Sequence, residues 1–124
     1  MARIKQGSCN VPEISVGVSK VDVLNMESSG KSLKDCTKPI IIKGIAIKHS
    51  TDEDGDPITK GFIVGDDGTA YGTVSVTAIR SLSNAADLLV DAEGDGAALT
   101  LEATVVHGKT KDDTEFITLS YREV

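Results

Sequence analysis

Two stretches of this chain place an aromatic ring and a row of hydroxyl groups on one side of a predicted strand. Side chains alternate with a period of two along a strand, so alternate residues share a face. The two sets are Tyr71, Thr73, Ser75 and Thr77 in residues 70–78, and Phe116, Thr118, Ser120 and Arg122 in residues 115–122. A ring can stack on a nucleic-acid base, while hydroxyls and a guanidinium can contact phosphate. The pattern is also typical of a one-sided sheet that keeps Thr and Ser in solvent.

The opposite sides of both strands are apolar. Val74 and Val76 share one face of the first strand, and Ile117, Leu119 and Tyr121 share one face of the second. We therefore expect these residues to face the core. The same phase predicts that Tyr71 and Phe116 face outward and that Tyr121 lies inside.

Composition indicates one soluble globular domain with an aliphatic core. The chain has 124 residues, of which 40% are hydrophobic and only 3% are aromatic. Its net charge of −6 argues against a protein that coats duplex DNA through bulk attraction alone. A local basic face is still possible, because lysine and arginine residues fall on or beside predicted strands. These residues are Lys43, Lys48, Lys60, Arg80, Lys109, Lys111 and Arg122.

The periodicity predicts a mainly β protein with one substantial helix. Strands are expected at 40–49, 58–66, 69–77, 98–108 and 114–122, and a switch to three- and four-residue steps predicts a helix over 78–92. A helix between the third and fourth of five strands is the plan of the OB-fold, a five-stranded Greek-key barrel. A β-sandwich is the rival architecture.

The amino-terminal part falls outside this plan. Residues 13–24 alternate and then slip phase near 19–20, which predicts an extra strand with a bulge, and residues 25–39 read as a loop. We therefore divide the chain into an arm with an extra strand at 1–38 and a barrel at 39–124, within one domain. The extra strand is expected to cover an edge of the barrel or to pair with a second copy, so we expect a homo-oligomer, most simply a dimer.

No motif predicts catalysis, a metal or a cofactor. The run DEDGDP at 52–57 begins like a calcium-binding loop, but Pro57 and Ile63 stand where that loop needs Gly and Glu, so it reads as an acidic turn. The sequence Gly-Lys-Ser at 30–32 lacks the opening glycine of a phosphate-binding loop. His49 and His107 have no metal-site spacing, and neither have Cys9 and Cys36. We expect a protein that is not an enzyme and has no small-molecule substrate.

The chain also lacks the features of an exported or membrane protein. It has no apolar run near 18 residues, and its start has no apolar region of a signal peptide. We therefore expect a cytoplasmic protein with reduced thiols and no membrane partner, in the host cytoplasm if a phage encodes it.

Residues 40–121 resemble the OB-fold single-stranded DNA-binding proteins of phages and mobile elements. Three segments carry the resemblance: IIIKGIAIK at 40–48, DGTAYGTVSVTAIRSLSNAADLL at 67–89, and LTLEATVVHGKTKDDTEFITLSY at 99–121. In such proteins a strand with an aromatic and hydroxyl residues runs into a helix, and a hairpin with a lysine-containing turn completes the barrel. The resemblance implies a non-enzymatic protein that coats single strands during phage or plasmid DNA replication or recombination.

The resemblance also implies a set of binding residues. Tyr71 and Phe116 would stack on bases, and Thr73, Ser75 and Arg122 would line the groove. Lys43, Lys48 and Lys60 would follow the phosphates. The residues do not distinguish DNA from RNA.

Two other functions fit the same composition. A virion structural protein, such as a capsid decoration or tail component, would explain the acidic surface and the abundance of Val, Thr and Gly. A small phage-encoded inhibitor of a host defence protein is the third candidate.

Overall fold

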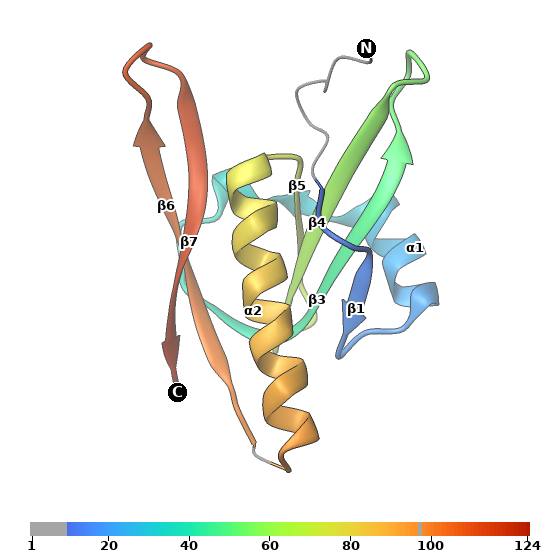
Figure 1. Ribbon diagram of the computed structural model, residues 1–124, viewed down its shortest axis with the longest axis vertical. Helices are drawn as coiled ribbons and strands as arrows, with labels where there is room; N and C mark the ends of the chain where they lie inside the picture. Colours follow the sequence, from blue (N-terminus) through green and yellow to red (C-terminus); the bar gives the residue numbers. More distant parts are fainter. Residues whose placement is uncertain (1–9, 97) are drawn as a thin grey trace.

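The computed structural model describes residues 10–96 and 98–124, and it shows a mainly β protein with one long helix (Figure 1). The described elements, in chain order, are β1 (Ile14–Val16), α1 (Lys20–Ser29), β2 (Lys31–Ser32), a short 3-10 helix (Leu33–Asp35), β3 (Ile40–Thr51), β4 (Pro57–Gly65), β5 (Ala70–Thr73), α2 (Val76–Gly94), β6 (Leu101–Lys109) and β7 (Glu115–Glu123). The helix expected at 78–92 lies within α2. The strands expected at 40–49, 58–66, 98–108 and 114–122 correspond to β3, β4, β6 and β7.

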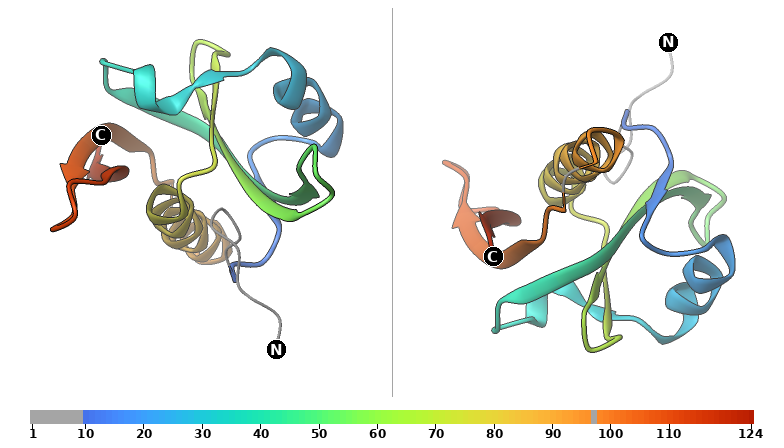
Figure 2. Two further views of the ribbon diagram at one scale, coloured as in Figure 1. Left: turned by 90° about the horizontal axis from the view of Figure 1, so that it is seen from above. Right: turned by 90° about the horizontal axis from the view of Figure 1, so that it is seen from below.

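The strands form one curled sheet in the order β2-β5-β4-β3-β6-β7. β3 makes the curl: one of its edges pairs with β4, while the other pairs first with β6, at Ile40 and Ile41, and then with β1, at 45–47. A register shift between Ile42 and Gly44 marks the bend between these two partners. Seen along the helix, β6 and β7 form one wall and β3, β4 and β5 the other (Figure 2).

The main core fills the space between these walls and α2. Its largest fully buried apolar side chains come from β3, β4, α2 and the 3-10 helix: Leu33, Ile45, Ile63, Ile79 and Leu82. α1 lies on the other side of the β3–β4 part of the sheet (Figure 2). There a second, smaller cluster is formed by Val23, Met26, Ala46, Phe62 and Val64. The β3–β4 part of the sheet is therefore covered by a helix on each face (Figure 2).

The curl leaves a half-barrel, because no backbone ladder joins β5 to β7 in the described residues. Two serine side chains bridge part of this opening. The Ser75 hydroxyl donates to the Ile117 carbonyl at 3.2 Å, and the Ser81 hydroxyl donates to the Leu119 carbonyl at 3.5 Å. These bonds satisfy acceptors on the outer edge of β7 that a closing strand would otherwise pair.

The strand expected over 13–24 is wrong beyond its first residues. Only Ile14–Val16 is a strand, and the chain is helical from Lys20. A reciprocal cap starts this helix: the Asp22 amide donates to the Ser19 hydroxyl at 3.1 Å, and the Ser19 amide donates to the Asp22 carboxylate at 3.0 Å. This cap and the burial of Val23 outweigh the strand preference of the β-branched residues. The loop expected over 25–39 is also partly ordered, as the end of α1, β2 and the 3-10 helix.

β1 approaches β3 at two glycines. Gly17 has φ +74, and a Cβ there would lie 2.3 Å from the Lys43 carbonyl oxygen. A Cβ on Gly44 would lie 2.5 Å from a methyl group of Val18. Neither position has room for a side chain. The extra strand thus covers the edge of β3 within the same chain, one of the two outcomes expected for it.

No helix in residues 10–96 or 98–124 combines the length and the apolar character needed to cross a membrane.

Candidate nucleic-acid interface

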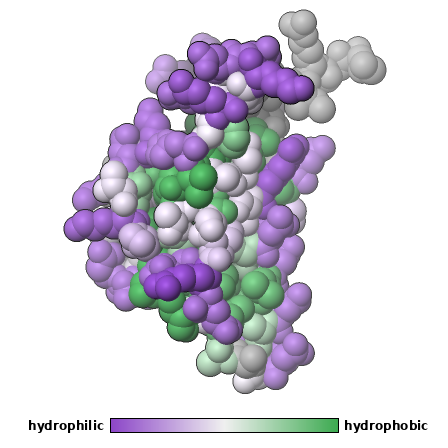
Figure 3. Space-filling model, turned by 90° about the vertical axis from the view of Figure 1, so that its left-hand side faces the viewer, coloured by the Kyte–Doolittle hydropathy of each residue, from purple (hydrophilic) through white to green (hydrophobic). Residues whose placement is uncertain are grey.

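An open groove of about 1220 Å³ lies beside the gap between β5 and β7. Its walls come from β4, β5, the start of α2, the start of β7 and the segment that contains β2 and the 3-10 helix. The groove contains aromatic rings, hydroxyl groups and lysines: Phe62, Phe116, Thr73, Ser75, Thr77, Lys31, Lys34 and Lys60. Figure 3 shows the β6–β7 side of the molecule, where green and pale residues extend from the middle of the face to its lower end and purple, hydrophilic residues gather at its top and sides.

Phe116 lies where its strand phase predicts. Ile117 and Leu119 are buried, while Phe116, Thr118, Ser120 and Arg122 occupy the outer face of β7. The expected position of Tyr121 is also confirmed, because its ring packs against the main core. Phe116 is half-buried at the groove end of the strand, and it pairs across the ladder with Gly108.

The expected outward position of Tyr71 is wrong. Its register partner on β4 is Ile63, which is fully buried, and the Tyr71 side chain packs against the main core. Burial, and to a smaller extent the neighbouring Cys36, raises the pKa of the Tyr71 hydroxyl. Val74, expected inside, is 50% exposed.

The cause of this error is that the strand ends early. β5 stops at Thr73, and Ser75 is the N-cap of α2, where its hydroxyl accepts from the Ala78 amide at 3.5 Å. The Ser75 amide in turn donates to the Thr73 hydroxyl at 3.0 Å. Thr77 lies in the first turn of the helix, so the expected row of hydroxyls on one strand does not exist. Thr73 and Ser75 still line the groove, through the strand end and the cap.

The three lysines expected to follow phosphates occupy different places. Lys60 lines the groove, and Lys48 lies directly opposite it on β3 in the ladder. By alternation both point to the outer face of the sheet, on the same side as Phe62. Lys43 lies at the bend of β3, beside Val16, Leu89 and Glu93 and away from the groove.

Lys31 and Lys34 were not among the expected binding residues, although both line the groove. They lie on β2 and the 3-10 helix, which pack beside β5. A signal is present in the sequence, since the segment between Gly30 and Pro39, for which a loop is expected, contains three lysines. What the sequence did not reveal was that this segment pairs with the sheet.

Arg122 is engaged by a carboxylate outside the groove. Its Nε donates to Glu102 Oε1 at 2.7 Å and its Nη2 donates to Oε2 at 3.3 Å, across the β6–β7 ladder. These bonds raise the pKa of the guanidinium. Arg122 lies six positions along β7 from Phe116, a distance of about 20 Å at the usual rise of a strand.

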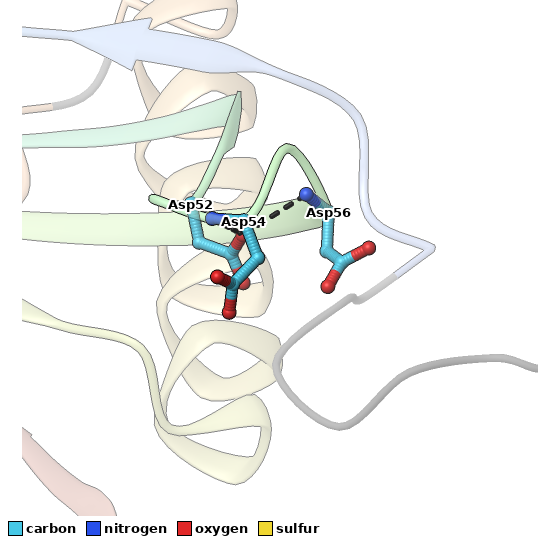
Figure 4. Close-up of side chains that lie close together, drawn as sticks. All are labelled: Asp52, Asp54 and Asp56. Carbon is cyan, nitrogen blue, oxygen red and sulfur yellow. Dashed lines mark hydrogen bonds between the residues drawn. The ribbon is translucent and has the colours of Figure 1, made fainter.

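The β3–β4 turn holds three carboxylates close together (Figure 4). One oxygen from each of Asp52, Asp54 and Asp56 lies within 4.8 Å of the others. Asp52 Oδ1 accepts from the amides of Asp54 and Asp56, each at 2.9 Å, and so supports the turn. This is the acidic turn that the sequence predicts.

Comparison with known proteins gives the family. The comparisons with curated proteins and with solved structures returned no significant match. Among protein families, residues 16–122 match the phage single-stranded DNA-binding proteins, so the match leaves out only the first fifteen and the last two residues. The matched range contains both walls of the sheet, α2 and every residue that lines the groove. The chain therefore belongs to the family of phage single-stranded DNA-binding proteins of the phi29 type.

Proposed function

We propose that this protein binds single-stranded DNA in the groove beside the β5–β7 gap, without catalysing a reaction, during phage DNA replication or recombination in the host cytoplasm. The observation that carries the proposal is the meeting of Phe116 with three lysines and several hydroxyl groups in one open groove. Single-strand binders combine these two features, because a ring stacks on any base and cations follow the backbone.

In this mode of binding Phe116 is the stacking platform and Lys31, Lys34 and Lys60 neutralise phosphates. Thr73 and Ser75 line the groove with hydroxyl groups. Lys48 extends the row of cations from its position opposite Lys60. Tyr71 is not among the lining residues of the groove and packs against the main core. Arg122 and Lys43 lie outside the groove, so they contact only DNA that is long enough to extend beyond it.

We further infer that the half-barrel is an OB-fold whose closing ladder is missing. The order β5-β4-β3-β6-β7, with α2 between β5 and β6, is that of the five-stranded Greek-key barrel. In that fold the ligand lies across the second and third strands, between the first hairpin turn and the last. In this chain those parts are β4, β5 and the turns at 52–56 and 110–114; β4, β5 and Thr114 of the last turn line the groove.

The direct test is the affinity of Phe116→Ala for a fluorescent oligo-dT, measured by anisotropy at low salt. Loss of one stacking partner costs about 1–3 kcal/mol, so we expect affinity to fall about 5- to 150-fold. The melting temperature should change little, since the ring is half-buried. Thr104→Ala, on the exposed face of the same hairpin, is the matched control.

If wild-type protein fails to bind oligo-dT at low salt, the proposal is wrong and a virion structural role takes its place. Repeating the titration with oligo-U compares RNA with DNA.

We also propose that the protein self-associates, most simply as a dimer. β1 covers the edge of β3 within the chain, so this edge is not the contact between copies. Light scattering at high concentration should then give a mass above 13.0 kDa. A monomer under those conditions would exclude this mode of assembly.

A further inference from the structure

The ring of Phe116 rests on a glycine. Phe116 and Gly108 are register partners in the β6–β7 ladder. A Cβ built on Gly108 would lie 2.5 Å from Cζ of Phe116 and 2.9 to 3.0 Å from both Cε atoms. Three atoms of the outer half of the ring therefore occupy the space where a side chain of residue 108 would stand. The ring lies across the ladder instead of pointing away from it.

A second phenylalanine of the protein also lies against a cross-strand glycine, but its ring is buried. Phe62 and Gly72 are register partners in the β4–β5 ladder, and a Cβ on Gly72 would lie 3.2 Å from the Phe62 ring. Phe62, however, is only 5% exposed, because Val23 and Met26 of α1 belong to the same cluster and cover it. Phe116 has no helix of this kind above it in the described residues, and it remains half-buried at the groove.

We propose that Gly108 is a positioning residue for single-strand binding: it provides a flat backbone seat that holds the Phe116 ring with its other face toward the groove. This inference rests on the proposed function, because it assigns a cause to the orientation of the proposed stacking platform. A ring stacks only if its face is presented to the base, and a ring held in advance loses less entropy on binding. Any larger residue at 108 lifts or rotates the ring.

The substitution that tests this is compatible with the fold. Gly108 is not among the glycines with positive φ, so the backbone accepts alanine there. The atoms that a methyl group meets are the far end of a side chain at the surface, which can swing aside. Alanine also has a better strand propensity than glycine, so stability should stay equal or rise. A purely structural role for Gly108 would instead lower stability and binding together.

The experiment is a double-mutant cycle with oligo-dT affinity as the measurement. We expect Gly108→Ala to weaken binding about three- to tenfold with an unchanged or higher melting temperature. In the Phe116→Ala background the same substitution should change affinity less than twofold, because the ring through which it acts is gone. Gly94→Ala, where an added methyl group meets nothing within 4 Å, is the matched control and should bind like wild type.

Two results separate this inference from the proposed function. If Phe116→Ala weakens binding but Gly108→Ala does not, or if Gly108→Ala has the same effect in both backgrounds, the positioning role of Gly108 is wrong. Binding of DNA in the groove is then still supported. If the wild type does not bind oligo-dT, the proposed function itself fails. Proton NMR of the free protein gives an independent answer: the ring should shift the Gly108 Hα signals upfield, and this shift should vanish in Phe116→Ala. Unshifted signals in the wild type would overturn the inference without any ligand.

Discussion

At the scale of single residues, the two tyrosines and Phe116 show how differently three rings on the same sheet are used. Phe116 is presented at the groove, Tyr71 supports the core beside Cys36, and Tyr121 is set into the core. The Ser81 hydroxyl shares its single proton between the Leu119 carbonyl and the Tyr121 hydroxyl, which accepts at 3.0 Å. Burial raises the pKa of Tyr121 to about 12, and the bond from Ser81 offsets only part of this effect.

We therefore predict that Tyr121 makes the fold sensitive to alkali. Because the folded pKa is raised, the neutral ring stabilises the fold fully below pH 10 and loses this contribution as pH rises through about 12. At 1.36 kcal/mol per pKa unit, the loss amounts to about 2–3 kcal/mol. Tyr121→Phe cannot ionise, so its free energy of unfolding in urea should fall less than that of the wild type between pH 9 and pH 12. Parallel curves for the two proteins would contradict this assignment.

The sequence predicted one of the two aromatic faces correctly, and the difference has a physical cause. On β7 nine strand residues keep one phase, and the alternation of Phe116, Ile117, Thr118 and Leu119 therefore determines which side is inside. On β5 only four residues form a strand, which ends at Thr73. Val74 lies beyond that end, so strand alternation does not apply to it. The missing information was the end of the strand. Ser75, three residues before Ala78, was the available sign of a helix start.

At the scale of elements, Ser75 connects three parts of the molecule. It caps α2, its amide is bound by Thr73 at the end of β5, and its hydroxyl donates to Ile117 on β7. We predict that Ser75→Ala lowers the free energy of unfolding by about 1–3 kcal/mol, since it removes both a helix cap and a bond across the open side of the barrel.

Thermal melting of Ser75→Ala measures this effect. Thr77→Ala, an exposed change in the first turn of the same helix, is the control and should leave stability within about 0.5 kcal/mol of the wild type. Equal melting temperatures for Ser75→Ala and the wild type would show that neither bond stabilises the fold. A loss of affinity without a loss of stability would point instead to direct contact between Ser75 and the strand.

α1 is the longest element that the sequence did not predict. Val16, Val18, Val21 and Val23 suggest a strand with a slip, and β-branched residues favour that reading. Two features favour the helix. One is the cap between Ser19 and Asp22, whose spacing can be seen in the sequence; the other is the packing of α1 on Phe62 of the sheet, which cannot. A ten-residue helix is marginal alone and depends on such packing.

At the scale of the whole molecule, an acidic protein gathers three lysines in one groove. The net charge is −6, yet Lys31, Lys34 and Lys60 meet in the groove, with Asp35 and Glu115 as its acidic lining residues. The strand order that brings these lysines together could not be obtained from the sequence. It depends on the parallel pairing of β2 with β5, which involves only two residues on each strand.

We predict a shallow dependence of binding on salt. Three neutralised phosphates on a single strand give a slope of log K against log salt of about −2, since each contributes about −0.7. Lys60→Ala should weaken binding to all sequences alike and bring the slope to about −1.4. Arg80→Ala, an exposed cation on α2, is the control and should leave the slope unchanged. A slope for Lys60→Ala equal to that of the wild type would remove Lys60 from the phosphate contacts.

The close approach of Gly17 and Gly44 has a consequence for solubility. β1 covers a stretch of β3, Ile45–Ile47, whose side chains are strongly apolar and whose backbone would otherwise be open to pairing. Uncovered edges of this composition recruit other chains and seed aggregates. A side chain at residue 44 would collide with Val18 and hold β1 away. We therefore expect Gly44→Val to become turbid on mild heating, well below the melting temperature of the core, while Gly94→Ala stays clear. Gly17 and Gly44 thus protect the protein from aggregation through the edge of β3.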